Sequence, residues 1–335
     1  MESHVITSVH NPRIRQWMQL LERKGRNKQQ KYLLEGVHLV EEAFRWKAPV
    51  ETVLYSMEKG VPASLTSFKE AAQDGETACE WIAVSDAVLK KCSETETPQG
   101  VIAIVRQQPY FVTAASTVSN AAAVSAAQAD SDTSAASAVP VDWSTPVDSA
   151  ALAISVDSPF PAASIPAAIA KRFSGPEALV VVLDGIQDPG NLGTIIRSAD
   201  AVGASGVILG RGTVDLYNPK TLRATMGSLF HLPVVWADLP ELLAQLPADG
   251  PVQVISTSLR AEDSCYDVDF TRPTWMIFGN EGAGVSPQVE SFVGRRVRIP
   301  MPGRAESLNV AMAATVMLFE AARQRGFSPN KNSCP

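Results

Sequence analysis

The sequence predicts an α/β protein whose C-terminal half contains a parallel sheet. The run Leu179–Leu183 is continuously apolar, as is typical of a strand buried on both faces of a parallel sheet. Further strand-like runs alternate with helix-like segments from there toward the C-terminus. Glycine-rich or polar segments follow several of these strands, at the edge where open α/β sheets bind ligands. We therefore expect a ligand site at the carboxyl edge of this sheet.

Length and composition favour a two-domain globular protein. A chain of 335 residues is long enough for about two domains. The four cysteines form no Cys-x-x-Cys pair, which argues against a zinc site or a disulfide framework and fits a reducing cytoplasm. We expect no secretory leader, because Met1–Val5 is polar, and no apolar run is long enough to span a bilayer.

Residues 1–106 are expected to form a small α/β domain. Apolar residues near helical spacing predict a helix over Lys31–Trp46. A short helix capped by Ser85 or Asp86 is expected after the second of three strands. The predicted strands are Thr52–Tyr55, Trp81–Val84 and Val101–Val105.

Residues 107–175 interrupt this pattern and are predicted to be a disordered linker. Alanine, serine, valine, threonine and aspartate dominate the segment, so few large apolar side chains can offset the entropy of ordering it. The second domain is then expected over residues 176–327, followed by a flexible tail over residues 328–335.

The second domain alternates strands and helices. Its first predicted helix begins at Asp188-Pro189 and ends near Gly203, and its last runs from Ser307 to Arg325 with Gly326 as cap. Two further helices are expected over Asn218–Phe230 and Pro240–Leu246. The remaining predicted strands are Val207–Leu209, Val234–Trp236, Val252–Ile255, Trp275–Phe278 and Val297–Ile299.

The net charge of −6 conceals a basic N-terminal region. Residues 107–170 contain five aspartates and no Lys, Arg or Glu, so the rest of the chain carries only −1. Residues 1–31 carry a local balance of +5. A basic patch is what phosphate binding requires, although a solvated helix face has the same composition. We expect four side chains of this region to bind RNA: Arg23, Lys24, Arg26 and Lys28.

Three segments together resemble motifs 1, 2 and 3 of the SpoU-type RNA ribose 2′-O-methyltransferases of the SPOUT superfamily. They are Leu183–Gly193 with Arg197, Phe278–Gly284, and Ile299–Met301 with Glu306–Val310. Leu34–Gly36 and Pro98–Val101 resemble the L30e-like substrate-binding domain that precedes many such catalytic domains. The resemblance implies a trefoil knot at the C-terminal end, a homodimer, S-adenosylmethionine as methyl donor, and rRNA or tRNA as substrate. Displacement of a methyl group from a sulfonium by an alcohol needs no metal, so we expect none.

The resemblance also assigns site residues. It places five side chains in the catalytic cleft: Asn191, Arg197, Glu281, Ser307 and Asn309. It implies a cofactor pocket lined by Gly279, Ile299 and Leu308. To these we add Met301 and Gly282 from the same loops, and Thr257, which follows the predicted strand Val252–Ile255. Backbone groups and apolar side chains suit the adenine ring.

The residues of the first motif suggest their own chemistry. Pro189-Gly190-Asn191 leaves backbone amides bare at a helix start, which suits an anion such as an RNA phosphate. By resemblance Arg197 activates the ribose hydroxyl, but a guanidinium is a poor base, so stabilisation of a developing alkoxide is the other role kept open. An Arg197–Glu281 pair would fix the guanidinium in one orientation.

Two other functions compete with methyl transfer. One is an RNA-binding or ribosome-assembly protein that has lost catalysis on the same fold. The other is a nucleotide-dependent dehydrogenase, which the glycine order Gly-x-x-Gly-x-Gly argues against, because the dinucleotide fingerprint needs Gly-x-Gly-x-x-Gly.

Overall fold

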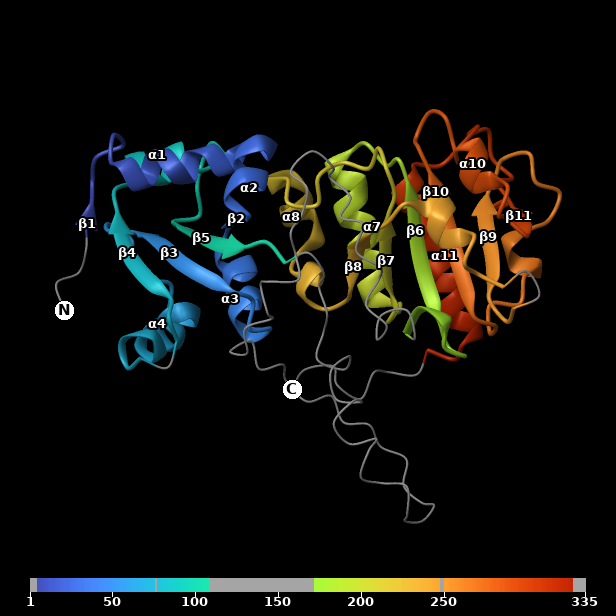
Figure 1. Ribbon diagram of the computed structural model, residues 1–335, viewed down its shortest axis with the longest axis horizontal. Coiled ribbons are helices and arrows are strands. Elements are labelled where there is room, and N and C mark those ends of the chain that lie inside the picture. The colour runs from blue at the N-terminus through green and yellow to red at the C-terminus, as the bar shows by residue number, and fades with distance from the viewer. Residues whose placement is uncertain (1–4, 76, 109–171, 248–249, 328–335) are drawn as a thin grey trace, which may run out of the picture. The chain divides into compact units, whose positions relative to one another are not determined.

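The computed structural model describes residues 5–75, 77–108, 172–247 and 250–327 (Figure 1). The chain divides into two compact units. Unit 1 comprises Met1–Pro109 and Asp215–Phe230, and unit 2 comprises Tyr110–Val214 and His231–Pro335. Most of the predicted linker and the whole predicted tail lie outside the described residues.

Unit 1 is built on a five-stranded mixed sheet with the strand order β1-β4-β3-β5-β2. β5 runs antiparallel to its neighbours β2 and β3, whereas β1, β4 and β3 are parallel. Apolar residues of both ends of this region, including Ile14, Leu54 and Ile104, form one buried cluster. The strands are β1 (Val5–Ile6), β2 (Lys31–Glu35), β3 (Val50–Ser56), β4 (Glu80–Val84) and β5 (Val101–Arg106).

The predicted helix Lys31–Trp46 is wrong in its first part, which is strand β2. Tyr32, Leu33 and Leu34 pair with β5, and the chain then turns at Gly36, whose φ is +109°. A residue other than glycine would be strained there, so Gly36 separates the strand from the helix. The helices of this region are α1 (Pro12–Met18), α2 (Arg23–Gln29), α3 (Val37–Arg45), α4 (Thr66–Gln73) and α5 (Asp86–Lys91), the last preceded by the N-cap Ser85.

Residues 215–230 also belong to unit 1, although the sequence places them inside the second domain. They contain α8 (Pro219–Thr225) and the 3₁₀ helix Ser228–Phe230 in place of the single predicted helix. Met226 and Gly227 between them have φ angles of +51° and +94°. This left-handed turn ends α8 early.

Unit 2 contains a six-stranded parallel sheet with the order β11-β9-β10-β6-β7-β8. The sheet confirms the predicted fold class. All four residues of β7 and all six of β10 are buried, which is why their sequences are almost uniformly apolar. The strands are β6 (Leu179–Asp184), β7 (Gly206–Leu209), β8 (Val234–Trp236), β9 (Gln253–Thr257), β10 (Thr274–Gly279) and β11 (Arg295–Val297).

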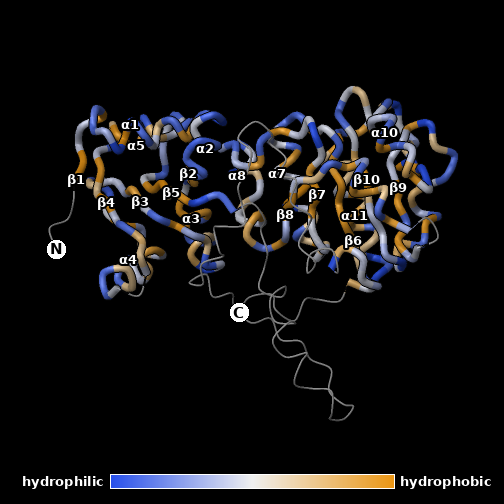
Figure 2. Tube along the Cα trace, in the orientation of Figure 1, coloured by the Kyte–Doolittle hydropathy of each residue, from blue (hydrophilic) through white to orange (hydrophobic). Residues whose placement is uncertain are grey.

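Buried strand residues such as Val182, Ile208 and Ile277 form the core of unit 2 together with Phe173. Figure 2 shows the hydrophobic residues gathered along the strands of this unit. The Phe173 carbonyl accepts a hydrogen bond from Trp275 Nε1 at 2.9 Å, so the last residues assigned to the linker are part of the folded core. The helices of unit 2 are α7 (Pro189–Ala201), α9 (Leu239–Leu243), α10 (Pro287–Glu290) and α11 (Val310–Gln324).

The N-cap of the last helix lies two residues later than predicted. Asn309, not Ser307, is the N-cap of α11, and its Oδ1 accepts from the backbone N–H groups of Ala311 and Met312. Gly326 follows the helix with a φ of +87°, as its predicted role requires. The trefoil knot stays a prediction of the family resemblance. Within the described part of the chain, no helix has the length and apolar character needed to cross a membrane.

Candidate functional site

Motifs 1 and 2 meet at the carboxyl edge of the unit 2 sheet because they follow neighbouring strands. β6 and β10 pair in parallel register, with Asp184 opposite Gly279 at their ends. Asp184 Oδ2 accepts a 2.7 Å hydrogen bond from the backbone N–H of Ser286, which ties the segment after motif 2 to the end of β6. A Cβ on Gly279 would lie 2.2 Å from the Gly284 carbonyl carbon, so only glycine fits there.

Asn280 organises the motif 2 loop. Its Oδ1 accepts hydrogen bonds from the N–H groups of Gly282 and Ala283 at 3.0 and 2.9 Å. Its Nδ2 donates to the Gly185 carbonyl at 2.9 Å and so connects the two motif loops. No role was predicted for Asn280 from the sequence, although asparagine's tendency to bond backbone groups two residues on was the available signal.

Glu281, at the tip of this loop, binds the start of α7. Its Oε1 accepts from the Asp188 N–H and from Asn191 Nδ2, at 3.2 and 2.9 Å, and its Oε2 accepts from the Gln187 N–H at 3.1 Å. Asp188 caps the helix by accepting from the Asn191 N–H at 2.9 Å. We expected these backbone amides to be free to bind a phosphate. Two of them instead donate to the Glu281 carboxylate.

The surroundings of Glu281 keep it ionised. Burial disfavours the charged form and acts to raise its pKa, but hydrogen bonds from Asn191 and from the backbone at Gln187 and Asp188 outweigh burial. The net result is a pKa below the ordinary glutamate value. An anion at a helix N-terminus is also stabilised by the helix dipole.

Motif 3 joins the same network through Asn309. Asn309 Nδ2 donates to Asn191 Oδ1 at 3.0 Å. The same two helices touch again further along. Ser198 is seven residues after Asn191 and Thr315 is six residues after Asn309, and their hydroxyl oxygens lie 2.7 Å apart. The helices α7 and α11 therefore run side by side in the same direction. Three of the five predicted catalytic residues therefore meet at the starts of these two helices: Asn191 in the first turn of α7, Asn309 at the N-cap of α11, and Glu281 from the motif 2 loop.

Arg197 does not join this cluster. It is exposed, and no hydrogen bond or ion pair connects it to Glu281 or to any other residue that the structure describes. Six residues after Asn191, it lies about 9 Å further along the helix and about 120° around its axis. The expected Arg197–Glu281 pair is therefore wrong for this structure, because Glu281 binds the first turn of α7 instead.

Ser307 and Leu308 lie in the exposed segment before α11. Among described residues, Ser307 has no hydrogen-bond partner, and its hydroxyl precedes the N-cap Asn309 by two positions. Ser307 is thus close in sequence to the Asn191–Asn309 contact and available to a ligand, but no contact assigns its role.

A cavity of about 480 Å³ lies beside motif 3. Its lining mixes apolar side chains and proline rings with one basic and one acidic residue: Leu259, Arg298, Ile299, Pro300, Met301, Pro302, Ala305 and Glu306. Two predicted cofactor residues, Ile299 and Met301, are thus part of it. The volume falls in the range of about 300–1,000 Å³ that is usual for small-molecule sites.

The other four predicted cofactor residues are not in the lining of this cavity. Gly279 and Thr257 end the neighbouring strands β10 and β9, and Gly282 and Leu308 lie on exposed loops. Arg298 and Glu306 were not assigned to the cofactor from the sequence. Isolated charged residues carry little local signal for a pocket.

The predicted RNA-binding residues of α2 separate into two groups. Arg23, Lys24 and Lys28 are exposed, as an RNA contact requires. Arg26 is only 2% exposed, and its guanidinium binds Asp215 and backbone carbonyls. Arg26 therefore cannot present its charge to a phosphate in this structure, and its assignment is wrong. Among the described residues, no group of His, Cys, Asp and Glu could hold a metal ion.

Comparisons with known proteins match both parts of the chain. Residues 178–319 match the SpoU rRNA methylase family, and residues 11–103 match the MRM3-like substrate-binding domain. A Bacillus subtilis relative named 23S rRNA (guanosine(2553)-2′-O)-methyltransferase is 31% identical over 314 residues, covering 94% of this chain and 97% of the relative.

Solved structures give the same result. The SpoU methyltransferase AviRb from Streptomyces viridochromogenes, in complex with S-adenosylmethionine, has a TM-score of 0.68 at 30% identity, covering 94% of this chain and 98% of AviRb. A rRNA methyltransferase from Sinorhizobium meliloti with the same ligand has a TM-score of 0.70 at 27% identity, covering 96% and 98%. The chain belongs to the SpoU rRNA methylase family.

Proposed function

We propose that this protein transfers a methyl group from S-adenosylmethionine to a ribose 2′-hydroxyl of ribosomal RNA. The observation that carries the proposal is the hydrogen-bonded cluster Glu281–Asn191–Asn309, in which one residue from each motif meets at the carboxyl edge of the sheet. The named relative and both ligand-bound neighbours support it. A non-catalytic RNA-binding role is less well supported, because it gives no reason for this cluster.

The cavity beside motif 3 fits the methyl donor. Apolar side chains at Leu259, Ile299 and Met301 suit the adenine ring, and Arg298 and Glu306 supply opposite charges for a zwitterionic amino-acid tail. When bound, S-adenosylmethionine supplies an electrophilic methyl group.

Glu281, Asn191 and Asn309 act by holding the two helix starts in one arrangement. Glu281 is ionised and its oxygens already accept three hydrogen bonds, so it is a weak acceptor for the ribose proton. Its role in this proposal is to orient the Asn191 amide, whose other end is fixed by Asn309. Alignment of reacting groups alone can lower a barrier by roughly 7–11 kcal/mol.

Arg197 supplies the positive charge in the proposal. It is exposed on α7 and is not neutralised by a described partner, so it can contact an RNA phosphate and stabilise the alkoxide that forms on the 2′-oxygen. Removal of the hydroxyl proton by Arg197 is the alternative role. The two roles differ in the pH dependence of the methyl-transfer rate, because only the base must lose a proton first.

The proposal includes a homodimer formed through α11. Three large apolar side chains on or next to this helix are exposed: Leu308 at 39%, Met312 at 51% and Phe319 at 43%. Met312 and Phe319 are seven residues apart and therefore lie on one face of the helix. An apolar face of this kind is typical of a protein contact. A cytoplasmic location, where ribosomal RNA is modified, completes the proposal.

The direct test is a map of ribose methylation in total RNA from cells with and without this protein. We expect one or a few 2′-O-methyl marks in ribosomal RNA to disappear when the protein is absent and to return when the intact chain is supplied. An unchanged map, with the protein shown to be expressed and folded, would overturn the proposal.

A further inference from the structure

Residues 215–230, here called the anchor segment, are held by the buried guanidinium of Arg26. Arg26 Nε and Nη2 donate to Asp215 Oδ2 at 2.9 and 2.7 Å, and Nη1 donates to the carbonyls of Leu20 and Leu21 at 2.8 and 2.6 Å. The two charged side chains are only 3% and 13% exposed. Loss of either partner would leave the other as a buried, unpaired charge.

A pair of stacked tyrosines adds an apolar contact beside this ion pair. The rings of Tyr32 on β2 and Tyr217 in the anchor segment have centroids 4.6 Å apart with 26° between their planes. Tyr217 donates its hydroxyl proton to the Gln108 carbonyl at 2.8 Å. Burial raises the pKa of both tyrosines, so both stay neutral. Without the anchor segment, the buried face of Tyr32 would be exposed to water.

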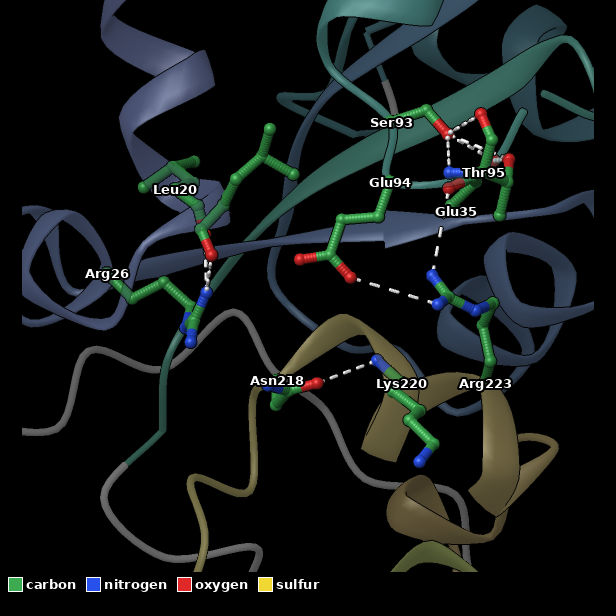
Figure 3. A network of polar contacts seen from close by, with 10 residues as sticks. Leu20, Arg26, Glu35, Ser93, Glu94, Thr95, Asn218, Lys220 and Arg223 are labelled. Atoms are coloured by element: carbon green, nitrogen blue, oxygen red, sulfur yellow. Dashed lines mark hydrogen bonds and ion pairs between the residues drawn. The ribbon is translucent and has the colours of Figure 1, made fainter. Parts of the chain in front are cut away.

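Further along the anchor segment, α8 faces a group of carboxylates and hydroxyls (Figure 3). Arg223 on α8 points toward two carboxylates of unit 1, Glu35 at 3.9 Å and Glu94 at 3.8 Å. Glu35 is fixed in turn by hydroxyl groups of Ser93 and Thr95. Gly227 packs so closely against Glu42 that a Cβ would lie 2.8 Å from its Cγ. Contacts thus extend over the whole segment.

The sequence position of the anchor segment makes these contacts informative. The segment lies inside residues 178–319, which match the methylase family, yet it packs as part of unit 1. Val214 before it and His231 after it belong to unit 2. The peptide chain therefore passes from unit 2 into unit 1 and back again at this segment, in addition to the connection through residues 109–171.

We propose that the anchor segment is the docking element that attaches the substrate-binding residues 5–108 to the methyltransferase. Residues 5–108 provide the binding surface, and the anchor segment of the same chain binds to it. A continuous chain between residues 109 and 171 is then not required for the two parts to stay together. The proposal concerns attachment and does not depend on which RNA is methylated.

The test uses the full chain with a specific protease site inserted between Ala135 and Ala136 and an affinity tag before Met1. After complete cleavage we expect the N-terminal fragment to co-elute with the C-terminal fragment in size-exclusion chromatography at roughly 1 µM, a concentration at which only an association of micromolar Kd or tighter persists. Separation of the two wild-type fragments would overturn the proposal, whatever the variants show.

Two variants then test the Arg26–Asp215 contact itself. Asp215→Ala should weaken the association of the cleaved fragments by roughly 100-fold or more, since it strands a buried guanidinium. Asp263→Ala is the matched control, because it removes an aspartate from an exposed ion pair with Arg295 in unit 2 and should leave co-elution unchanged. Asp215→Asn keeps an acceptor oxygen and should fall between them. Fragments of Asp215→Ala that associate as tightly as wild type would contradict the proposed contact.

Discussion

Arg26 and Arg197 are both helix arginines that the sequence assigns to RNA, but their surroundings are opposite. Arg26 is 2% exposed and its charge is matched by Asp215, which is 189 residues away in sequence. Arg197 is exposed and has no partner among the described residues. The sequence shows where a positively charged side chain stands but not what that side chain does. That function is decided by whether the fold brings a carboxylate to it.

The largest effect on stability is expected from Arg26→Met. The substitution leaves Asp215 buried without its partner and should lower the free energy of unfolding of unit 1 by about 3–5 kcal/mol. The double variant Arg26→Met with Asp215→Leu should recover much of this loss, because a buried pair can be replaced by apolar side chains at little cost. Urea denaturation measures both.

The matched control for that experiment is Arg295→Met, since Arg295 pairs with Asp263 at the surface. It should change the free energy of unfolding by less than about 1 kcal/mol. Equal destabilisation by Arg26→Met and Arg295→Met would contradict a structural role for Arg26.

Arg197→Ala should do the reverse and affect rate without affecting stability. Loss of a cation that stabilises developing charge should lower the methyl-transfer rate by about 10²–10³-fold. The free energy of unfolding should stay within about 0.5 kcal/mol of wild type, as for other exposed substitutions. Titration calorimetry should show unchanged S-adenosylmethionine affinity.

Arg272→Ala is the control for Arg197→Ala, because Arg272 is exposed and precedes β10 at the opposite edge of the sheet. It should retain full activity. Wild-type rates for Arg197→Ala would remove Arg197 from the mechanism.

Glu281→Gln should lower the free energy of unfolding by a smaller amount that depends on pH. The native pKa of Glu281 lies below its ordinary value, so its stabilising effect is complete above pH of about 4.3, the value in the unfolded chain, and is lost as pH falls through the native pKa. The variant should be less stable than wild type by about 1 kcal/mol at pH 7. Urea denaturation curves at pH 7 and pH 3 should show this difference shrinking in acid. A constant difference would mean that the Glu281 charge does not hold α7.

Neutralising the exposed cations of α2 should have the smallest effect per residue replaced, and the property affected is RNA affinity. Replacement of Arg23, Lys24 and Lys28 by glutamine should weaken RNA binding at low salt. It should also reduce the slope of log affinity against log salt by about 0.7–0.9 for each phosphate that is no longer neutralised by a bound cation. Filter binding across a salt series measures this slope. An unchanged slope would show that α2 does not contact RNA. The exposed cations of α2 would then have no RNA-binding role, just as buried Arg26 has none.

The parallel sheet and the motif cluster could be predicted because they depend on local patterns. Apolar runs such as Leu179–Leu183 form buried strands, and adjacent parallel strands bring the loops after Asp184 and Gly279 together. The resemblance supplied the assignment of Glu281 and Asn309, and the structure connects both through Asn191. Asn280 could have been predicted only in part: asparagine commonly bonds backbone groups two residues on, but its bond to the Gly185 carbonyl joins two loops far apart in sequence.

The features that were not predicted from the sequence depend on contacts between residues far apart along the chain. The helical spacing of Leu34, Val37 and Val40 led to a helix predicted from Lys31, but pairing with β5 makes Lys31–Glu35 a strand. The segment 215–230 looks like part of the second domain in sequence, but Asp215 and Tyr217 pack with Arg26 and Tyr32. Burial of a charge is likewise set by its distant partner.

We propose that the cluster at the sheet edge directs a methyl group to a ribose oxygen. The most direct measurement is to incubate the purified full chain with isotopically labelled S-adenosylmethionine and ribosomal RNA, digest the RNA to nucleosides and identify the labelled product by mass spectrometry. We predict a nucleoside labelled on its 2′-oxygen, and about 10²–10³-fold slower labelling with Arg197→Ala. A label on a base, or no label from protein that is folded and binds S-adenosylmethionine, would contradict the account.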